Sequence, residues 1–233
     1  MDISKHRIPK ALKNCTIENS VVRFAYSSPF HRLYIQEQVV NAFKAAGVEL
    51  EEYRAINERN MNPNDPNHKI SFFTNGLLKF MIERQAISFN CVSGYPGWAA
   101  YTEFFHCALN AIPNEKLRFN DVGIRYISTY DLPIFEKLDG RVELNWFKDI
   151  NGAEIRFPAT GSDFGGLVRV TNLLRSTDGS TQKSFVDVDI RTQLKEGTIE
   201  EAFRSCEMIH LEEKKHFFQL LSFDFVNELG PTY

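Results

Sequence analysis

Residues 119–130 constrain the fold most, because they predict a buried strand with an arginine in its middle: Phe-Asn-Asp-Val-Gly-Ile-Arg-Tyr-Ile-Ser-Thr-Tyr. An arginine in an apolar strand is costly unless a carboxylate meets it. We therefore expect Arg125 to form a structural ion pair with Asp187 or Asp189, with Glu207 as the alternative. Such a pair would be a feature of the fold before a feature of catalysis.

The composition is that of a globular protein. The chain has 233 residues, 43% hydrophobic and 24% charged, and its 20 phenylalanines indicate an aromatic core. The net charge of −3 gives no general attraction to nucleic acid. No run of eighteen apolar residues predicts a membrane span, so we expect no membrane partner. The first residues lack an apolar signal region and the four cysteines form no C-x-x-C motif, which together predict a cytoplasmic protein with reduced thiols.

The order of predicted elements indicates an α+β fold. Ser28-Pro29 is a helix-start signal and Gly47 a stop, whereas 57–69 is a polar loop. The other expected elements are strands at 21–26, 77–82, 86–92, 167–174 and 185–190, and helices at 96–112 and 198–222. Residues 132–160 carry mainly turn signals. The layout predicts two related halves, 1–131 and 132–233, each a curved antiparallel sheet packed on a helix; one compact domain is the alternative.

The last helix is expected to be long and to begin near Thr198, because Thr198–Glu201 reads as a capping box. The charged run 212–215 should face solvent, and Phe218 should meet a second surface because it cannot share a narrow stripe with Phe217. That surface is within the chain, or else it belongs to a partner protein or a second copy. The inner face should carry Phe203, Cys206 and Phe217.

Two Glu-x-x-His pairs, Glu103 with His106 and Glu207 with His210, each place both side chains on one helical face. Such pairs are typical of di-metal sites in helix bundles, which also need glutamates from two further helices. Here the neighbours read as strands, so we expect surface or interface pairs, no metal and no cofactor. Whether the two pairs meet in space is left open by the sequence.

Several short motifs, taken together and in order, carry a family resemblance. They are Leu12-Lys-Asn-Cys-Thr-Ile17, Tyr95-Pro-Gly-Trp98, Val122-Gly-Ile-Arg-Tyr-Ile127, Val186-Asp-Val-Asp-Ile190, and Ile209-His-Leu211 followed by Phe217. On these the chain resembles a sporadically distributed family of uncharacterised bacterial and archaeal proteins. Thr16 and Ser128 depart from the family pattern, which usually has proline and asparagine there. The resemblance implies no activity, but the family's patchy distribution is similar to that of genes in mobile or defence islands.

The absence of a catalytic motif in the sequence favours a non-enzymatic binding or sensing protein. We expect it to be prokaryotic and part of a defence or toxin-control system, with a protein partner or a second copy of the chain. Its candidate interaction surface is Tyr95, Trp98 and Phe218.

The alternative is an RNA-binding protein or RNA-processing nuclease of a tandem α+β fold. Its phosphate contacts would come from His6, Arg7 and Lys10, and its acid or base would be His31 or His68. The negative net charge argues against this reading.

Overall fold

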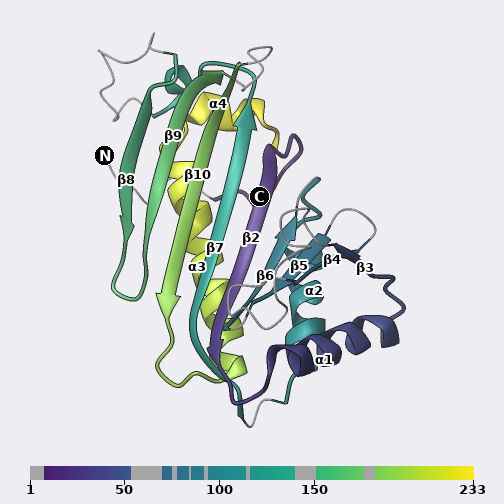
Figure 1. Cartoon of the computed structure of the whole chain (residues 1–233). Coiled ribbons are helices and arrows are strands. Elements are labelled where there is room, and N and C mark those ends of the chain that lie inside the picture. The colour runs from purple at the N-terminus through teal and green to yellow at the C-terminus, as the bar shows by residue number, and fades with distance from the viewer. Residues whose placement is uncertain are drawn as a thin grey trace. The chain divides into compact units, whose positions relative to one another are not determined.

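The structure is a computed structural model that describes residues 8–53, 70–74, 78–83, 85–91, 94–113, 116–139, 151–175 and 182–233. Within these residues, strands are hydrogen-bonded in the order β3-β4-β5-β6-β2-β7-β10-β9-β8, and β1 pairs separately with β11 (Figure 1). The sheet strands are β2 (Ile17–Ser27), β3 (Glu51–Tyr53), β4 (Ile70–Thr74), β5 (Leu78–Ile82), β6 (Ala86–Cys91), β7 (Arg118–Tyr130), β8 (Glu154–Thr160), β9 (Gly165–Arg175) and β10 (Gln182–Gln193). The short strands are β1 (Ala11–Leu12) and β11 (Pro231–Thr232). The helices are α1 (Arg32–Ala45), α2 (Trp98–Asn110), η4 (a 3-10 helix, Ile134–Lys137), α3 (Ile199–Leu220) and α4 (Phe223–Glu228).

The predicted α+β class and the long helix near the C-terminus are confirmed, and the strands form a large antiparallel sheet. The chain forms two compact units. The first contains the residues up to Glu18, Arg125–Ile190 and Met208–Tyr233, and the second contains Asn19–Ile124 and Arg191–Glu207. Each unit therefore combines segments that are distant in sequence. That 1–131 and 132–233 are related halves stays a prediction.

The second unit has an aromatic core. Alternate residues of β2 point inward, and Val22 and Phe24 are fully buried opposite Phe89 and Ile87 of β6. The ring of Phe24 lies 5.3 Å from that of Phe105 on α2, and on the same helix the ring of Phe104 lies 4.8 Å from that of Phe43 on α1. The inner residues of α1 recur every four positions, which buries one stripe of the helix: Ile35, Val39 and Phe43.

Helix α1 begins later than Ser28-Pro29 predicted. The Ser28 hydroxyl accepts a hydrogen bond from Phe30 N–H and so closes a local turn instead of capping a helix. His31 has an extended backbone, and its Nδ1 accepts from Leu33 N–H, so His31 is the N-cap. The predicted stop at Gly47 is confirmed by its left-handed φ of 73° and its bond to Lys44 O.

In the first unit, α4 and the end of α3 pack on one side of the strands (Figure 1). The ring of Tyr130 on β7 lies 5.5 Å from that of Phe225 on α4, and the Tyr126 hydroxyl meets His210 on α3. The inner side of β10 is fully buried and apolar, through Val186, Val188 and Ile190. The described helices include none that is long and apolar enough to cross a membrane.

The capping of α3 by Thr198 is confirmed, since its Oγ1 accepts from Glu201 N–H at 3.1 Å. The expectation that all of 212–215 is solvated was wrong, because Glu213 is only 3% exposed. Phe203 packs on Phe24 and Phe105 of its own unit. Phe218 is half-buried with its ring against Phe217, and its second surface stays a prediction.

Strand β8 lies in a stretch that carried mainly turn signals, and β3, β4 and α4 had no predicted counterpart. The predicted polar loop 57–69 lies outside the described residues, as do His6, Arg7 and His68.

Candidate binding face

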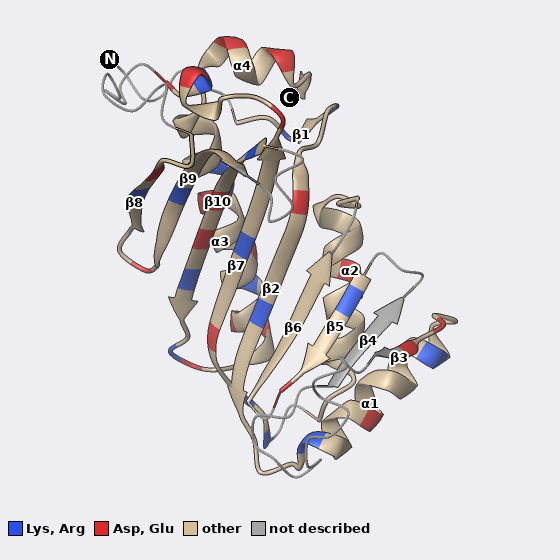
Figure 2. Ribbon diagram, turned by 45° about the horizontal axis from the view of Figure 1, so that its top comes forward, with Lys and Arg blue, Asp and Glu red and all other residues tan. Residues whose placement is uncertain are grey.

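The candidate site lies on the outer face of the strands of the first unit, opposite the buried tyrosines. Side chains alternate along a strand, so burial of Tyr126, Ser128 and Tyr130 on β7 places Arg125 on the other face. Figure 2 shows residues of both charges along β7, β8, β9 and β10. This face is therefore polar where the opposite face is closed by helices.

Arg125 and Asp187 form a two-pronged ion pair on this face. The Nε and Nη2 atoms of Arg125 donate to the two carboxylate oxygens of Asp187, each at 2.8 Å. These hydrogen bonds raise the pKa of Arg125, opposed by partial burial, and the charges of Asp187 and Asp189 raise it further. Asp187 is thus the acid that Arg125 binds. The expected interior position was wrong, because the Arg125 side chain is 40% exposed on the outer face.

Arg169 on β9 approaches the same carboxylate but makes no hydrogen bond with it. Its Nη1 lies 3.8 Å from Oδ2 of Asp187, the oxygen that already accepts from Arg125. The Arg169 Nε is buried and has no hydrogen-bond partner within the described part of the chain, although the side chain as a whole is 37% exposed. A buried donor without a partner loses its hydration without compensation. Arg169 therefore presents a guanidinium group with unused donors.

A second arginine stands directly opposite Arg169. The register of β8 and β9 pairs Arg156 with Arg169. Asn172 N–H donates to Ala153 O three pairs away. Bonded and non-bonded pairs alternate, so the two arginines form a non-hydrogen-bonded pair, whose Cα atoms are only about 4.5 Å apart. Like charges opposite each other weaken a sheet.

Acids and apolar side chains are interleaved with these arginines. Glu154 Oε1 lies 2.6 Å from Arg156 Nε, and its other oxygen accepts from the Thr171 hydroxyl at 3.4 Å. The Nζ atom of Lys183 lies 3.9 Å from Oε1 of Glu18. Three half-buried apolar residues share the face by strand alternation: Ile127, Leu167 and Phe185.

The aromatic residues proposed for interaction are held within the second unit. The Trp98 indole N–H donates to the carboxylate of Glu207, with distances of 2.9 and 2.8 Å to its two oxygens. The ring of Tyr95 meets that of Tyr101 edge-on at 6.1 Å. Both residues are half-buried. Glu207, the alternative partner for Arg125, is engaged by Trp98.

The Glu-x-x-His residues do not gather into one cluster, although Glu207 of the second pair is near enough to act on His106 of the first. Glu103 is exposed, and the His106 ring stacks on Phe203 at 3.8 Å. Burial lowers the pKa of His106, against an opposing effect of Glu207. His210 contacts the Tyr126 hydroxyl in the first unit. Over the described residues, no three His, Cys, Asp or Glu side chains are grouped as a metal ion would require.

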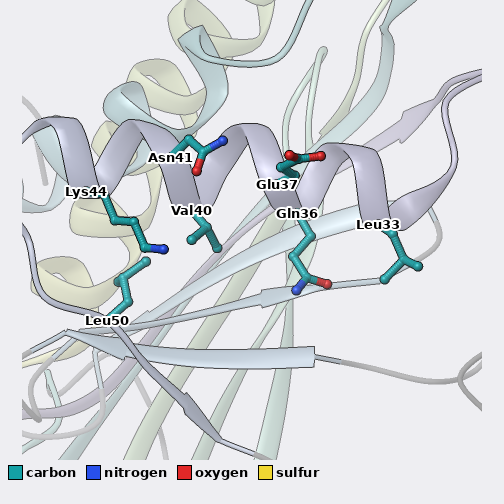
Figure 3. Close-up of a pocket in the computed structure, with 7 residues that line it drawn as sticks. All are labelled: Leu33, Gln36, Glu37, Val40, Asn41, Lys44 and Leu50. Atoms are coloured by element: carbon teal, nitrogen blue, oxygen red, sulfur yellow. The ribbon is translucent and has the colours of Figure 1, made fainter.

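A shallow pocket of about 400 Å³ lies on the second unit beside α1 (Figure 3). Its lining mixes apolar, amide and charged side chains, and the Gln36 Oε1 there is buried without a partner among the described residues. The lining residues are Leu33, Gln36, Glu37, Val40, Asn41, Lys44 and Leu50.

No protein-family model matches the chain, and a search of curated proteins finds no match. The site therefore stands on its geometry. Arg156 and Arg169 were not predicted as site residues from the sequence, although each lies between two apolar residues. Ile155 and Phe157 flank Arg156, and Val168 and Val170 flank Arg169. That pattern marks both as outward-facing, but their pairing depends on the register of the hairpin.

Proposed function

We propose that this chain is a non-enzymatic binding protein and that a partner protein docks on the outer face of its first unit. The observation that carries the proposal is Arg169, whose buried Nε has no hydrogen-bond partner within the described residues. Arginine is one of the residue types enriched among the hot spots of protein interfaces, and its guanidinium binds carboxylates strongly. The Arg169 side chain is 37% exposed, so a carboxylate from a partner would accept hydrogen bonds from the exposed part of this guanidinium.

The mixed character of the face favours a protein over a nucleic acid. Glu18, Glu154 and Asp187 lie among the basic residues and would repel a phosphate backbone. The half-buried Leu167 and Phe185 add apolar contact area, and protein interfaces combine such residues with arginine. The negative net charge of the chain points the same way.

Docking on the face is favoured over pairing at the strand edge. β8 is the last strand in the hydrogen-bonding order of the described residues, and it contains Pro158. Pro158 and Leu167, like Arg156 and Arg169, form a non-hydrogen-bonded pair, so the nitrogen of Pro158 points away from β9. Proline has no N–H to offer there, which blunts an edge against strand addition.

A role in prokaryotic defence or toxin control is part of the proposal. It rests on the resemblance to the sporadically distributed family alone. The neighbouring genes test it: an adjacent effector or toxin gene that recurs beside this one is the expected finding, and scattered unrelated neighbours would contradict it.

The docking proposal is tested with two labelled polymers, poly-glutamate and single-stranded RNA, whose fluorescence anisotropy is followed as the protein is added. We expect poly-glutamate to bind, with affinity that falls as salt rises, and RNA to remain unbound and intact. Tighter binding of RNA, or its cleavage, would replace the proposal by the RNA-processing alternative. A protein that binds neither polymer at low salt would overturn docking of an acidic partner.

A further inference from the structure

We infer that Arg156 and Arg169 together form a clamp for one carboxylate side chain of the partner. This inference rests on the proposed function and adds to it the residues and the chemical group that anchor the complex. The clamp consists of the side chains of Arg156 and Arg169, whose residues are paired directly across β8 and β9 in the first unit.

Without a ligand, the pairing of Arg156 with Arg169 destabilises the sheet. Arg156 and Arg169 are directly opposite in the closer kind of antiparallel pair, and like charges there are destabilising. An anion between the two side chains turns this repulsion into two attractions. The pairing of the two arginines therefore favours a negative group between them, in addition to the nearby Glu154 and Asp187.

The arginines of this face differ in how many of their side-chain N–H groups already bind an acid. Arg125 uses Nε and Nη2 on Asp187, and Arg156 uses Nε on Glu154. The side chain of Arg169 makes no hydrogen bond within the described residues, and the nearest acid oxygen, Oδ2 of Asp187, lies 3.8 Å from its Nη1. The planar guanidinium fork matches a carboxylate with two parallel hydrogen bonds. Arg169 is therefore the principal contact and Arg156 the second.

The acids beside the clamp favour a carboxylate over a phosphate group. Oxygens of Asp187 and Glu154 lie 3.8 and 2.6 Å from nitrogens of the two clamp arginines. A group with a single negative charge is repelled less by these acids than a phosphate with nearly two. The partner residue is thus a glutamate or an aspartate.

The test uses three end-blocked peptides of the same length, rich in glutamate, phosphoserine or glutamine, and measures their dissociation constants by calorimetry. The variants are Arg169→Gln, Arg169→Lys and Arg156→Gln. The matched control is Arg191→Gln, since Arg191 is an exposed outer-face arginine of β10 that belongs to the second unit. Thermal unfolding of each variant checks that it is folded.

We expect the glutamate peptide to bind the unaltered protein and the glutamine peptide not to bind. Arg169→Gln should weaken binding by about tenfold or more, and Arg156→Gln by less. Arg169→Lys keeps the charge but loses the fork, so it should recover only part of the affinity. Arg191→Gln should leave the affinity unchanged.

The side-chain Nε–H resonance of Arg169, assigned by its loss in Arg169→Lys, gives a readout that does not depend on stability. It should shift saturably with the glutamate peptide. Unchanged affinity in Arg169→Gln and an unmoved resonance would overturn the clamp while docking on the face still stands. Tighter binding of the phosphoserine peptide would overturn the choice of a carboxylate. An unaltered protein that binds no acidic peptide would overturn the proposed function and the clamp together.

Discussion

Two glutamates on helix α3 are both buried, yet their pKa values move in opposite directions. Glu201, in the second unit, is 9% exposed, and Glu213, in the first, is 3% exposed. Burial raises the pKa of both carboxyl groups. In Glu201, three backbone hydrogen bonds outweigh burial and hold the pKa below its usual range. In Glu213, burial prevails over the opposing charge of Lys214 and raises the pKa well above it.

The difference lies in the donors that surround each carboxylate. The oxygens of Glu201 accept from the N–H groups of Lys195, Glu196 and Gly197 at 2.9, 2.8 and 2.7 Å. No hydrogen bond to the Glu213 carboxyl is found within the described residues, and its electrostatic neighbours are Lys214 and Tyr130. The comparison teaches that fixed donors keep a carboxylate charged where little of it is exposed, whereas deep burial without donors favours the neutral acid.

The largest expected effect is that of Glu201→Ala. Three N–H groups lose a charged acceptor, one of them in a buried bond, so the free energy of unfolding should fall by about 2–4 kcal/mol. Urea unfolding at neutral pH measures the loss. Glu200→Ala is the control, because Glu200 is exposed in the same helical turn. Equal losses in the two variants would contradict the role given to the backbone donors.

Next is Gly197→Ala, which disturbs the turn that carries these donors. Gly197 has a left-handed φ of 74°, and an added Cβ would lie 2.8 Å from Phe119 O. We expect a loss of about 1–3 kcal/mol in the free energy of unfolding. Gly47→Ala has a similar φ of 73° but open space around the new Cβ, so it should cost less. Identical costs would mean that conformation alone, without crowding, explains Gly197.

These two residues show what sequence can predict locally. Thr198 and Glu201 correctly marked the start of α3, because a cap is formed within a few residues. In a capping box the Glu201 side chain would accept from Thr198 N–H. Instead it accepts from the N–H groups of the three residues before Thr198. The left-handed turn at Gly197 brings those N–H groups together, and that turn could not be read from the capping pattern.

Glu213 shows where the charged run misled the sequence analysis. Its neighbours Glu212, Lys214 and Lys215 predicted a solvated face. Helical spacing overrides that composition, since Ile209, Glu213 and Phe217 recur every four residues on the buried stripe.

The same lesson applies to the binding face. An interior Arg125 was predicted from its apolar neighbours, although alternation with Ile124 and Tyr126 directs it outward. Asp187 was among its predicted partners because it is a polar residue on another predicted core strand. The pairing of Arg156 with Arg169 could not be inferred from the sequence. Pro158 made β8 resemble a turn, and the register of a hairpin depends on how its two strands pair.

Glu213→Gln should change how stability depends on pH. An unfolded glutamate loses its proton near pH 4.3, whereas the folded carboxyl with a raised pKa keeps it. The unfolded state then binds fewer protons, so stability is full below that pH and is lost as pH rises towards the folded pKa. The glutamine variant lacks this linkage and should unfold at a higher temperature than the unaltered protein at mildly alkaline pH, but not at acidic pH. Parallel melting curves of the two proteins across pH would contradict the raised pKa.

The smallest expected effect belongs to the neighbouring pair of Tyr126 and His210. The Tyr126 hydroxyl lies 3.3 Å from His210 Nδ1 in the buried interior, and Tyr126→Phe removes this contact at a cost of about 0.5–1.5 kcal/mol.

Burial, with the charge of Lys214, lowers the pKa of His210 to about 3, so the folded histidine stays neutral while the unfolded one binds a proton below about pH 6.5. Stability from this group is therefore present above that pH and is lost as pH falls towards 3, opposite in sign to the effect of Glu213. The His210 resonance, followed by NMR through an acid titration, measures the shift directly, and a histidine that titrates at its ordinary value while the protein is folded would show that the ring is not held neutral by burial.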